Sequence, residues 1–148
     1  MATFTTKQVR NVALLGHGGS GKTSLAEAML YLSKATDRLG KPSAGNTVCD
    51  CDPEEIKRGF SINLTLANTV WKGTKINIID TPGFLDFEGE VQAALRVCGS
   101  ALFTVDAKAG VEVGTELAWD NATTSGTPKA FFINKTDDPE ADFERVFD

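Results

Sequence analysis

The stretch Gly16-His17-Gly18-Gly19-Ser20-Gly21-Lys22-Thr23 decides the fold of this chain. It fits the phosphate-loop pattern, in which a glycine is followed by four residues and then by Gly-Lys-Thr. Before it stands the apolar run Val9-Arg10-Asn11-Val12-Ala13-Leu14-Leu15, which has the length of a strand. After it, residues 24–34 carry apolar side chains at helical spacing, namely Leu25, Met29 and Leu32. Strand, glycine-rich loop and helix in this order are the context that the motif requires.

The residue types of this loop suit the binding of phosphate. Glycines let the backbone take positive φ angles and turn its N–H groups inward, and the helix that begins near Lys22 adds free N–H groups. Lys22 can reach the outer phosphates of a nucleotide, and the Thr23 hydroxyl can bind Mg2+. A glycine-rich turn in an α/β domain is the alternative. The predicted phosphate site comprises Gly16, His17, Gly18, Gly19, Ser20, Gly21, Lys22, Thr23 and Ser24.

Composition sets the broad class of the protein. The 148 residues suffice for one domain with a hydrophobic core, and the net charge of −5 argues against a nucleic-acid-binding face, so no direct DNA binding is expected. No apolar run approaches the roughly 20 residues of a membrane span, and residues 1–7 lack a signal-peptide core. Since the single histidine lies in the phosphate loop, the three cysteines are expected to be free thiols in a reducing compartment. We therefore expect a cytoplasmic protein.

The rest of the chain alternates between strand and helix patterns. Residues 35–59 lack a clean period and are expected to form a long loop that is functional or disordered. Two strands, 62–71 and 75–80, are joined by the turn Lys72-Gly73 and predict an antiparallel hairpin. The further elements are expected at 87–97 (helix), 101–105 (strand), 111–124 (helix), 129–133 (strand) and 139–147 (helix). This order predicts a three-layer α/β domain whose sheet is mostly parallel, with one antiparallel strand.

A second motif follows the strand at 75–80. Asp80 closes this strand and is followed by Thr81-Pro82-Gly83. A carboxylate at the carboxyl end of a strand beside a phosphate loop can hold Mg2+ through water, and Gly83 can bring a backbone N–H close to a terminal phosphate. The alternative is that Asp80 caps the next helix.

A third motif, Asn134-Lys135-Thr136-Asp137, follows the last predicted strand. The carboxylate of Asp137 can accept hydrogen bonds from both adjacent donors of guanine, a pair that adenine does not offer. Asn134 can contact the base carbonyl or brace the phosphate loop, and the stem of Lys135 can lie along the base. Because all three motifs stand at the carboxyl ends of strands, where open α/β sheets bind ligands, they predict guanine-nucleotide binding by a phosphate-loop NTPase fold, a G domain.

The chain resembles the GTPase domain of elongation factor G and its relatives among the translational GTPases, from about residue 9 to residue 143. Besides the three motifs, the resemblance rests on Arg58-Gly59-Phe60-Ser61-Ile62, Trp71-Lys72-Gly73, residues 76–83, Asp86-Phe87, Glu90-Val91 and Asp106-Ala107. It implies GTP and GDP as substrate and product, Mg2+ as cofactor and the ribosome as partner of the full-length protein. It also implies two switch loops, residues 35–61 and 80–90, that order around the γ-phosphate. Ser61 stands where the family has a threonine of the Mg2+ shell, so the implied metal set is Thr23, Ser61 and Asp80.

Two positions depart from the family pattern. Gly19 stands where the family usually has an aspartate that is linked to a monovalent cation, and Phe84 stands where the family has the histidine that positions the attacking water. The implied catalytic set is Lys22, Gly83 and Phe84, which stands at the position of the family's catalytic histidine although its ring cannot hydrogen-bond water. These departures resemble the atypical paralogues of elongation factor G.

Three functions compete at this stage. The leading hypothesis is a slow GTP hydrolase that works with the ribosome, and the alternative is a GTP-gated binding module with negligible hydrolysis. An unrelated phosphate-loop ATPase or kinase is disfavoured by residues 134–137. The family's GTPase domain continues past the length of this sequence, so we expect residues 1–148 to be a GTP-binding domain that is incomplete at its C-terminal end. Such a fragment is expected to be monomeric, with an exposed sheet edge and a weaker base pocket.

Overall fold

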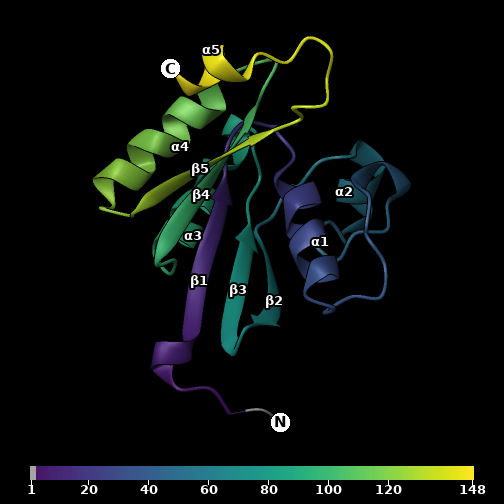
Figure 1. Ribbon diagram of the computed structural model, residues 1–148, viewed down its shortest axis with the longest axis vertical. Helices are drawn as coiled ribbons and strands as arrows, with labels where there is room; N and C mark the ends of the chain where they lie inside the picture. Colours follow the sequence, from purple (N-terminus) through teal and green to yellow (C-terminus); the bar gives the residue numbers. More distant parts are fainter. Residues whose placement is uncertain (1–2) are drawn as a thin grey trace.

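A computed structural model describes residues 3–148, which form a five-stranded sheet with helices on both faces (Figure 1). The strand order is β2-β3-β1-β4-β5, and the strands are β1 (Val9–Leu15), β2 (Thr65–Trp71), β3 (Thr74–Asp80), β4 (Ser100–Asp106) and β5 (Lys129–Asn134). β1 pairs in parallel with β3 and β4, β4 pairs in parallel with β5, and β2 runs antiparallel to β3. The predicted mostly parallel α/β sheet with one antiparallel strand is therefore confirmed.

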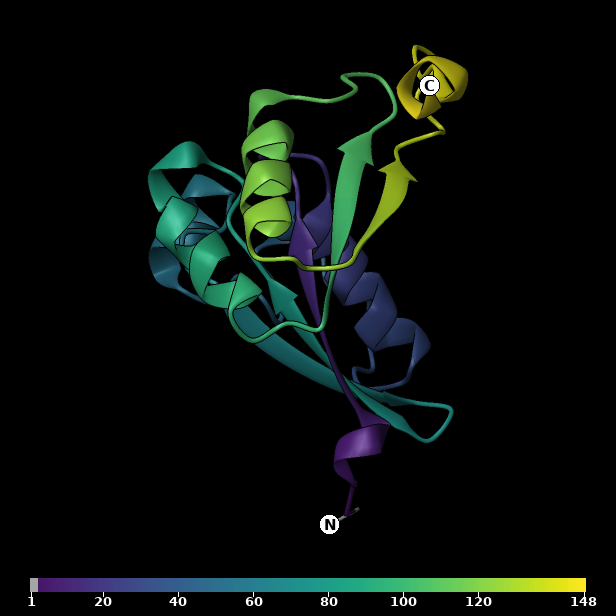
Figure 2. The same cartoon turned by 90° about the vertical axis from the view of Figure 1, so that its left-hand side faces the viewer.

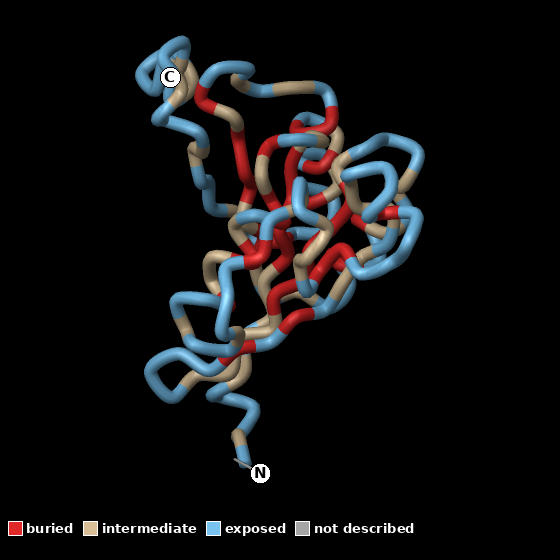
Figure 3. Tube along the Cα trace, turned by 90° about the vertical axis from the view of Figure 1, so that its right-hand side faces the viewer, coloured by how far each residue is buried: buried red, intermediate tan, exposed pale blue. Residues whose placement is uncertain are grey.

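The helices lie in two layers because successive residues of a strand face opposite sides of the sheet. The helices are α1 (Lys22–Leu32), α2 (Pro53–Arg58), α3 (Glu88–Leu95), α4 (Val113–Thr124) and α5 (Phe143–Phe147). On one face, which α3 and α4 cover in Figure 2, Leu15 and Phe103 pack with the buried side chains of these two helices. On the other face, Leu14 and Ile78 pack with Ala26 and Leu30 of α1. Figure 3 shows the buried residues gathered along the strands between these layers.

The segment 35–59 corrects one expectation, because it contains regular structure. A 3-10 turn spans Pro42–Ala44, and the helix α2 spans Pro53–Arg58. The Asp52 carboxylate caps α2 by accepting from the N–H of Glu54 at 2.8 Å, and Gly59 ends it with a φ of 73°. A six-residue helix is too short to show a hydrophobic period, but its Asp-Pro start and glycine end were visible in the sequence.

Two further boundaries were predicted wrongly by a few residues. β2 begins at Thr65 instead of residue 62, because residues 61–64 are held by side chains and not by the ladder with β3. α5 begins at Phe143 instead of residue 139. The Asp142 carboxylate caps the helix at this point by accepting from the N–H of Arg145 at 3.0 Å. Residues 61–64 and 139–142 are therefore irregular backbone and not, as predicted, parts of a strand and a helix.

β5 forms one edge of the sheet within the described residues, as expected from the sequence. On this strand Phe131 and Phe132 are exposed, and Phe131 stacks on Trp119 with ring centroids 5.6 Å apart. Whether the domain is incomplete stays a prediction. The three cysteines are free, as predicted. No helix between residues 3 and 148 is long and apolar enough to cross a membrane.

Candidate nucleotide-binding site

The phosphate loop joins β1 to α1 at the carboxyl end of the parallel strands. Gly16, Gly19 and Gly21 have φ angles of 134°, 84° and 97°, which only glycine adopts readily. Gly18 is different, because its φ is not positive. A methyl group on it would lie 3.1 Å from the ring of Phe84. The expectation that the glycines of this loop provide positive φ angles is therefore wrong for Gly18, which instead leaves room for an aromatic ring.

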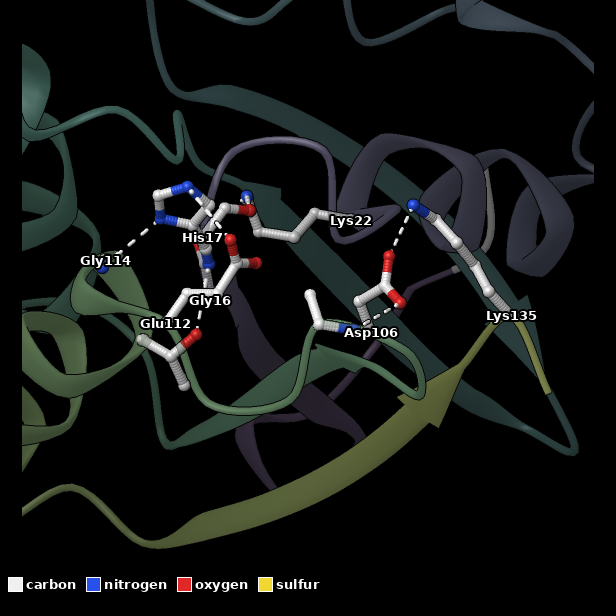
Figure 4. Close-up of polar contacts among 9 residues, drawn as sticks. Gly16, His17, Lys22, Asp106, Glu112, Gly114 and Lys135 are labelled. Carbon is white, nitrogen blue, oxygen red and sulfur yellow. Dashed lines mark hydrogen bonds and ion pairs between the residues drawn. The ribbon is translucent and has the colours of Figure 1, made fainter. Parts of the chain in front are cut away.

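The Lys22 side chain folds back onto its own loop. Its Nζ donates to the carbonyl oxygens of Gly16 at 2.9 Å and His17 at 2.8 Å (Figure 4). The side chain is buried, and burial lowers the pKa of Lys22 to about 8, although the charges of Asp80 and Asp50 oppose this shift. Lys22 is thus a cation enclosed at the centre of the loop.

His17 connects the phosphate loop to the start of α4. Its Nδ1 accepts from the N–H of Gly114 at 3.3 Å, and its Nε2 lies 3.5 Å from Oε1 of Glu112 (Figure 4). Its backbone N–H donates to the Thr115 hydroxyl at 3.3 Å. The imidazole points toward the start of α4, so His17 links the phosphate loop to that helix.

Two hydroxyls and two carboxylates meet at the start of α1. The Thr23 hydroxyl donates to Oδ2 of Asp80 at 2.7 Å and lies 3.2 Å from the Ser61 hydroxyl. Ser61 in turn donates to Oδ1 of Asp50 at 2.7 Å. The structure therefore brings the predicted residues Thr23, Ser61 and Asp80 together. It adds Asp50, which the sequence did not reveal because it lies in an unpatterned segment.

This cluster is suited to a hard divalent cation. Asp80 is 1% exposed, and its Oδ1 has no hydrogen-bond partner among the described residues. Burial raises the pKa of Asp80 to about 7, opposed by the hydrogen bond from Thr23 and the charge of Lys22. Residues 3–148 hold no group of three or more His, Cys, Asp or Glu side chains that could bind a metal ion alone. Mg2+ fits this site, because it commonly takes one or two protein oxygens together with water and the phosphates of a substrate.

The segment 80–90 lies close against the phosphate loop at Gly83. A methyl group on Gly83 would lie 2.5 Å from the backbone N of Gly18 and 2.6 Å from the carbonyl carbon of His17. The next residue, Phe84, packs edge-on against Phe60 with ring centroids 4.6 Å apart. The phosphate loop and the segments 35–61 and 80–90 together line a cavity of about 200 Å³. It is lined by Gly18, Gly19, Gly21, Lys22, Thr23, Ser24, Pro42, Asp50, Gly59, Phe60, Ser61, Gly83 and Phe84.

The residues predicted to read the base do not line this cavity. Asn134 donates from Nδ2 to the carbonyl oxygen of Ser20 at 2.9 Å, so of its two possible roles it performs the bracing of the phosphate loop. Lys135 donates to Oδ2 of Asp106 at 2.7 Å (Figure 4). Asp137 is exposed. Asp106 closes β4 as Asp80 closes β3, which is the signal that could have identified it.

Comparison with known proteins agrees with this geometry. The family model described as the elongation factor Tu GTP binding domain matches residues 7–148. An elongation factor G-like protein of Mycobacterium tuberculosis is 42% identical over 93% of this chain and 19% of its own length. Elongation factor G 2 of Streptomyces coelicolor is 42% identical over 97% of this chain and 21% of its own length. The mitochondrial ribosome-releasing factor 2 of Scheffersomyces stipitis is 44% identical over 94% of this chain and 16% of its own length.

A solved structure from Thermus thermophilus superposes with a TM-score of 0.91 at 38% identity, covering 95% of this chain and 21% of that one. The chain thus spans about a fifth or less of the length of these proteins. The match nevertheless extends over nearly all of its own residues, and it includes the phosphate loop and the segments 35–61 and 80–90. The chain therefore belongs to the family of the elongation factor Tu GTP-binding domain.

Proposed function

We propose that this chain binds GTP and GDP with Mg2+ and hydrolyses GTP slowly, as the G domain of an elongation factor G-like translation factor that acts on the ribosome. The observation that carries the proposal is that the Thr23 hydroxyl contacts both Ser61 and Asp80, while Lys22, Thr23 and Ser61 line one cavity. Family membership and the names of the relatives support GTP binding and a role in translation.

The phosphates would lie against the phosphate loop. Lys22 would exchange its two carbonyl partners for phosphate oxygens, and the N–H groups at the start of α1 would donate to the same anion. Bound Mg2+ would supply positive charge that neutralises the phosphates, held by the Thr23 and Ser61 hydroxyls with Asp80 behind them. Burial lowers the pKa of Lys22 and raises the pKa of Asp80, and phosphate oxygens beside Lys22 and a cation beside Asp80 would favour the charged forms of both groups.

The base would be read by residues 134–137. The exposed carboxylate of Asp137 is proposed to accept from the two adjacent donors of guanine. The stem of Lys135 would lie along the base while Asp106 holds its ammonium group, and Asn134 would keep the phosphate loop at a fixed distance from the base.

Slow hydrolysis follows from the residue at position 84. Catalysis of phosphoryl transfer consists mainly of positioning and of charge stabilisation, and the Phe84 ring can contribute neither a donor nor an acceptor to a water molecule. Phe84 instead packs on Phe60 and over Gly18 at the cavity. This packing also favours the second candidate, a GTP-gated binding module with negligible turnover, in which Gly83 and Phe84 would sense the nucleotide without aiding its hydrolysis.

Two measurements test the proposal. In competition against a fluorescent GDP analogue with Mg2+, GTP and GDP should displace the probe while ATP should not, and equal displacement by ATP would indicate an ATPase or kinase instead. Single-turnover hydrolysis with and without ribosomes then separates a slow GTPase from a binding module, since only the GTPase releases phosphate. The cytoplasmic location, the monomeric state and the lack of DNA binding remain predictions, and one relative is named as mitochondrial.

A further inference from the structure

Glu55 is a buried carboxylate that the phosphate and base motifs do not use. It lies on α2 and is 2% exposed. Its Oε1 accepts from the N–H groups of Ile62 at 2.9 Å and Asn63 at 3.0 Å, and its Oε2 accepts from the N–H of Asp52 at 3.3 Å. A carboxylate offers only acceptors, so three backbone donors suit it, and they compensate for its burial.

The segment that Glu55 binds, residues 61–64, lies outside regular secondary structure. Its N–H groups therefore need side-chain partners. Glu55 takes two of these groups, and Glu90 of α3 accepts from the N–H of Leu64 at 2.8 Å. The backbone directly after Ser61 is thereby fixed by two carboxylates from two different helices.

We propose that Glu55 is a positioning residue that holds the Ser61 hydroxyl beside Thr23, so that both hydroxyls reach the same Mg2+. Ile62 directly follows Ser61, so the two bonds from Glu55 fix the backbone that carries the hydroxyl. This hydroxyl lies 3.2 Å from that of Thr23 and donates to Asp50. The inference rests on the proposed function, in which Ser61 and Thr23 serve the same metal ion.

Two neighbours of Glu55 provide matched controls. Glu54 lies on the same helix but is exposed and pairs with Arg58 at 3.1 Å, so Glu54→Ala removes a carboxylate without touching the segment. Asp52 caps α2 through the N–H of Glu54 and has no bond to Ile62 or Asn63, so Asp52→Ala weakens the helix alone. If Glu55 acted only by stabilising α2, Asp52→Ala would reproduce the effects of Glu55→Ala.

The first readout is amide hydrogen exchange in the chain saturated with Mg2+ and a non-hydrolysable GTP analogue. Glu55→Ala should speed exchange at Ile62 and Asn63 by about tenfold, corresponding to the loss of one charge-assisted hydrogen bond. The amides of β1 and β4 should keep their protection, which shows that the core is folded. Glu54→Ala should leave the segment unchanged. Unchanged exchange in Glu55→Ala, or an equal increase in Asp52→Ala, would overturn the inference.

The second readout is the factor by which Mg2+ tightens GTP binding, measured by titration with and without the metal. Glu55→Ala and Ser61→Ala should each reduce this factor, and the double variant should be no worse than Ser61→Ala alone, because both changes remove the same hydroxyl from the site. Additive losses, or a loss in Ser61→Ala only, would overturn the role of Glu55. No loss in Ser61→Ala would instead show that the metal assignment in the proposed function is wrong.

Discussion

Replacing Gly83 by alanine should selectively weaken the binding of GTP. The φ angle of Gly83 lies outside the left-handed region, so the backbone itself tolerates alanine and space is the only obstacle. The added methyl group would lie 2.5 Å from the backbone N of Gly18 and 2.6 Å from the carbonyl carbon of His17, with Nζ of Lys22 nearer still. Ordinary contact distances are about 3.5 Å, so the two loops must separate by about 1 Å.

This separation sets the magnitude of the effect. Overpacking of this kind costs about 1–3 kcal/mol, which corresponds to a loss of about 5- to 150-fold in affinity. The loss should be larger for GTP than for GDP, because Gly83 is proposed to donate its N–H to the terminal phosphate. Isothermal titration of both nucleotides with Mg2+ measures the two affinities and their ratio.

Gly89 provides the control, since a methyl group placed there meets no atom within 4 Å. Gly89 lies in α3, where the change from glycine to alanine should stabilise the fold by about 0.4–1 kcal/mol and leave both affinities unchanged. If Gly83→Ala binds GTP as tightly as the unchanged protein, or loses GTP and GDP equally, then Gly83 does not approach the terminal phosphate.

Three further predictions concern the metal, the catalytic step and the base side. Thr23→Ala should remove most of the effect of Mg2+ on GTP affinity while changing metal-free affinity little, and equal Mg2+ effects in both proteins would contradict the role of Thr23. Phe84→His should raise ribosome-stimulated hydrolysis at nearly constant affinity, because it provides a group that can hydrogen-bond water; equal rates would show that another group positions it. Burial raises the pKa of Asp106, but hydrogen bonds from Lys135 and from the N–H groups of Lys108 and Ala109 outweigh it and hold this pKa below its ordinary value. Asp106 therefore stabilises the fold above pH 3.8, and this stabilisation is lost as the pH falls through the lower pKa of the folded state. Lys135→Met should raise the pKa of Asp106 in an NMR titration, and an unchanged pKa would show that Lys135 does not set it.

The sheet was predictable because its strands carry strong local signals. The apolar runs of β1, β3 and β4 and the turn at Lys72-Gly73 gave the elements and the antiparallel hairpin. α2 was missed because its six residues bury only Glu55, which leaves no hydrophobic period. The start of β2 was placed too early because Ile62 and Leu64 read as strand residues, whereas their N–H groups donate to the carboxylates of Glu55 and Glu90 and not to a neighbouring strand.

The candidate site was predictable where one motif supplies several residues. Lys22 and Thr23 follow from a single pattern, and Asp80 follows from the end of a strand. Asp50 and Glu55 were not predictable, because their importance depends on how residues 47–64 fold back onto α1 and α3. The need for glycine at position 18 was also not predictable, because the ring that leaves no room for a side chain there belongs to Phe84, far away in the sequence.

The specificity of Asp137 for guanine tests the proposed function most directly. In the Asp137→Asn variant one acceptor becomes a donor, which opposes the N1–H of guanine but suits the ring carbonyl of xanthine. Titration should show that GDP binding weakens by about 1.5–3 kcal/mol, the value of a charge-assisted hydrogen bond, and that xanthosine diphosphate binds more tightly than it does to the unchanged protein. Unchanged GDP affinity in this variant, with no gain for the xanthine nucleotide, would contradict guanine recognition by Asp137.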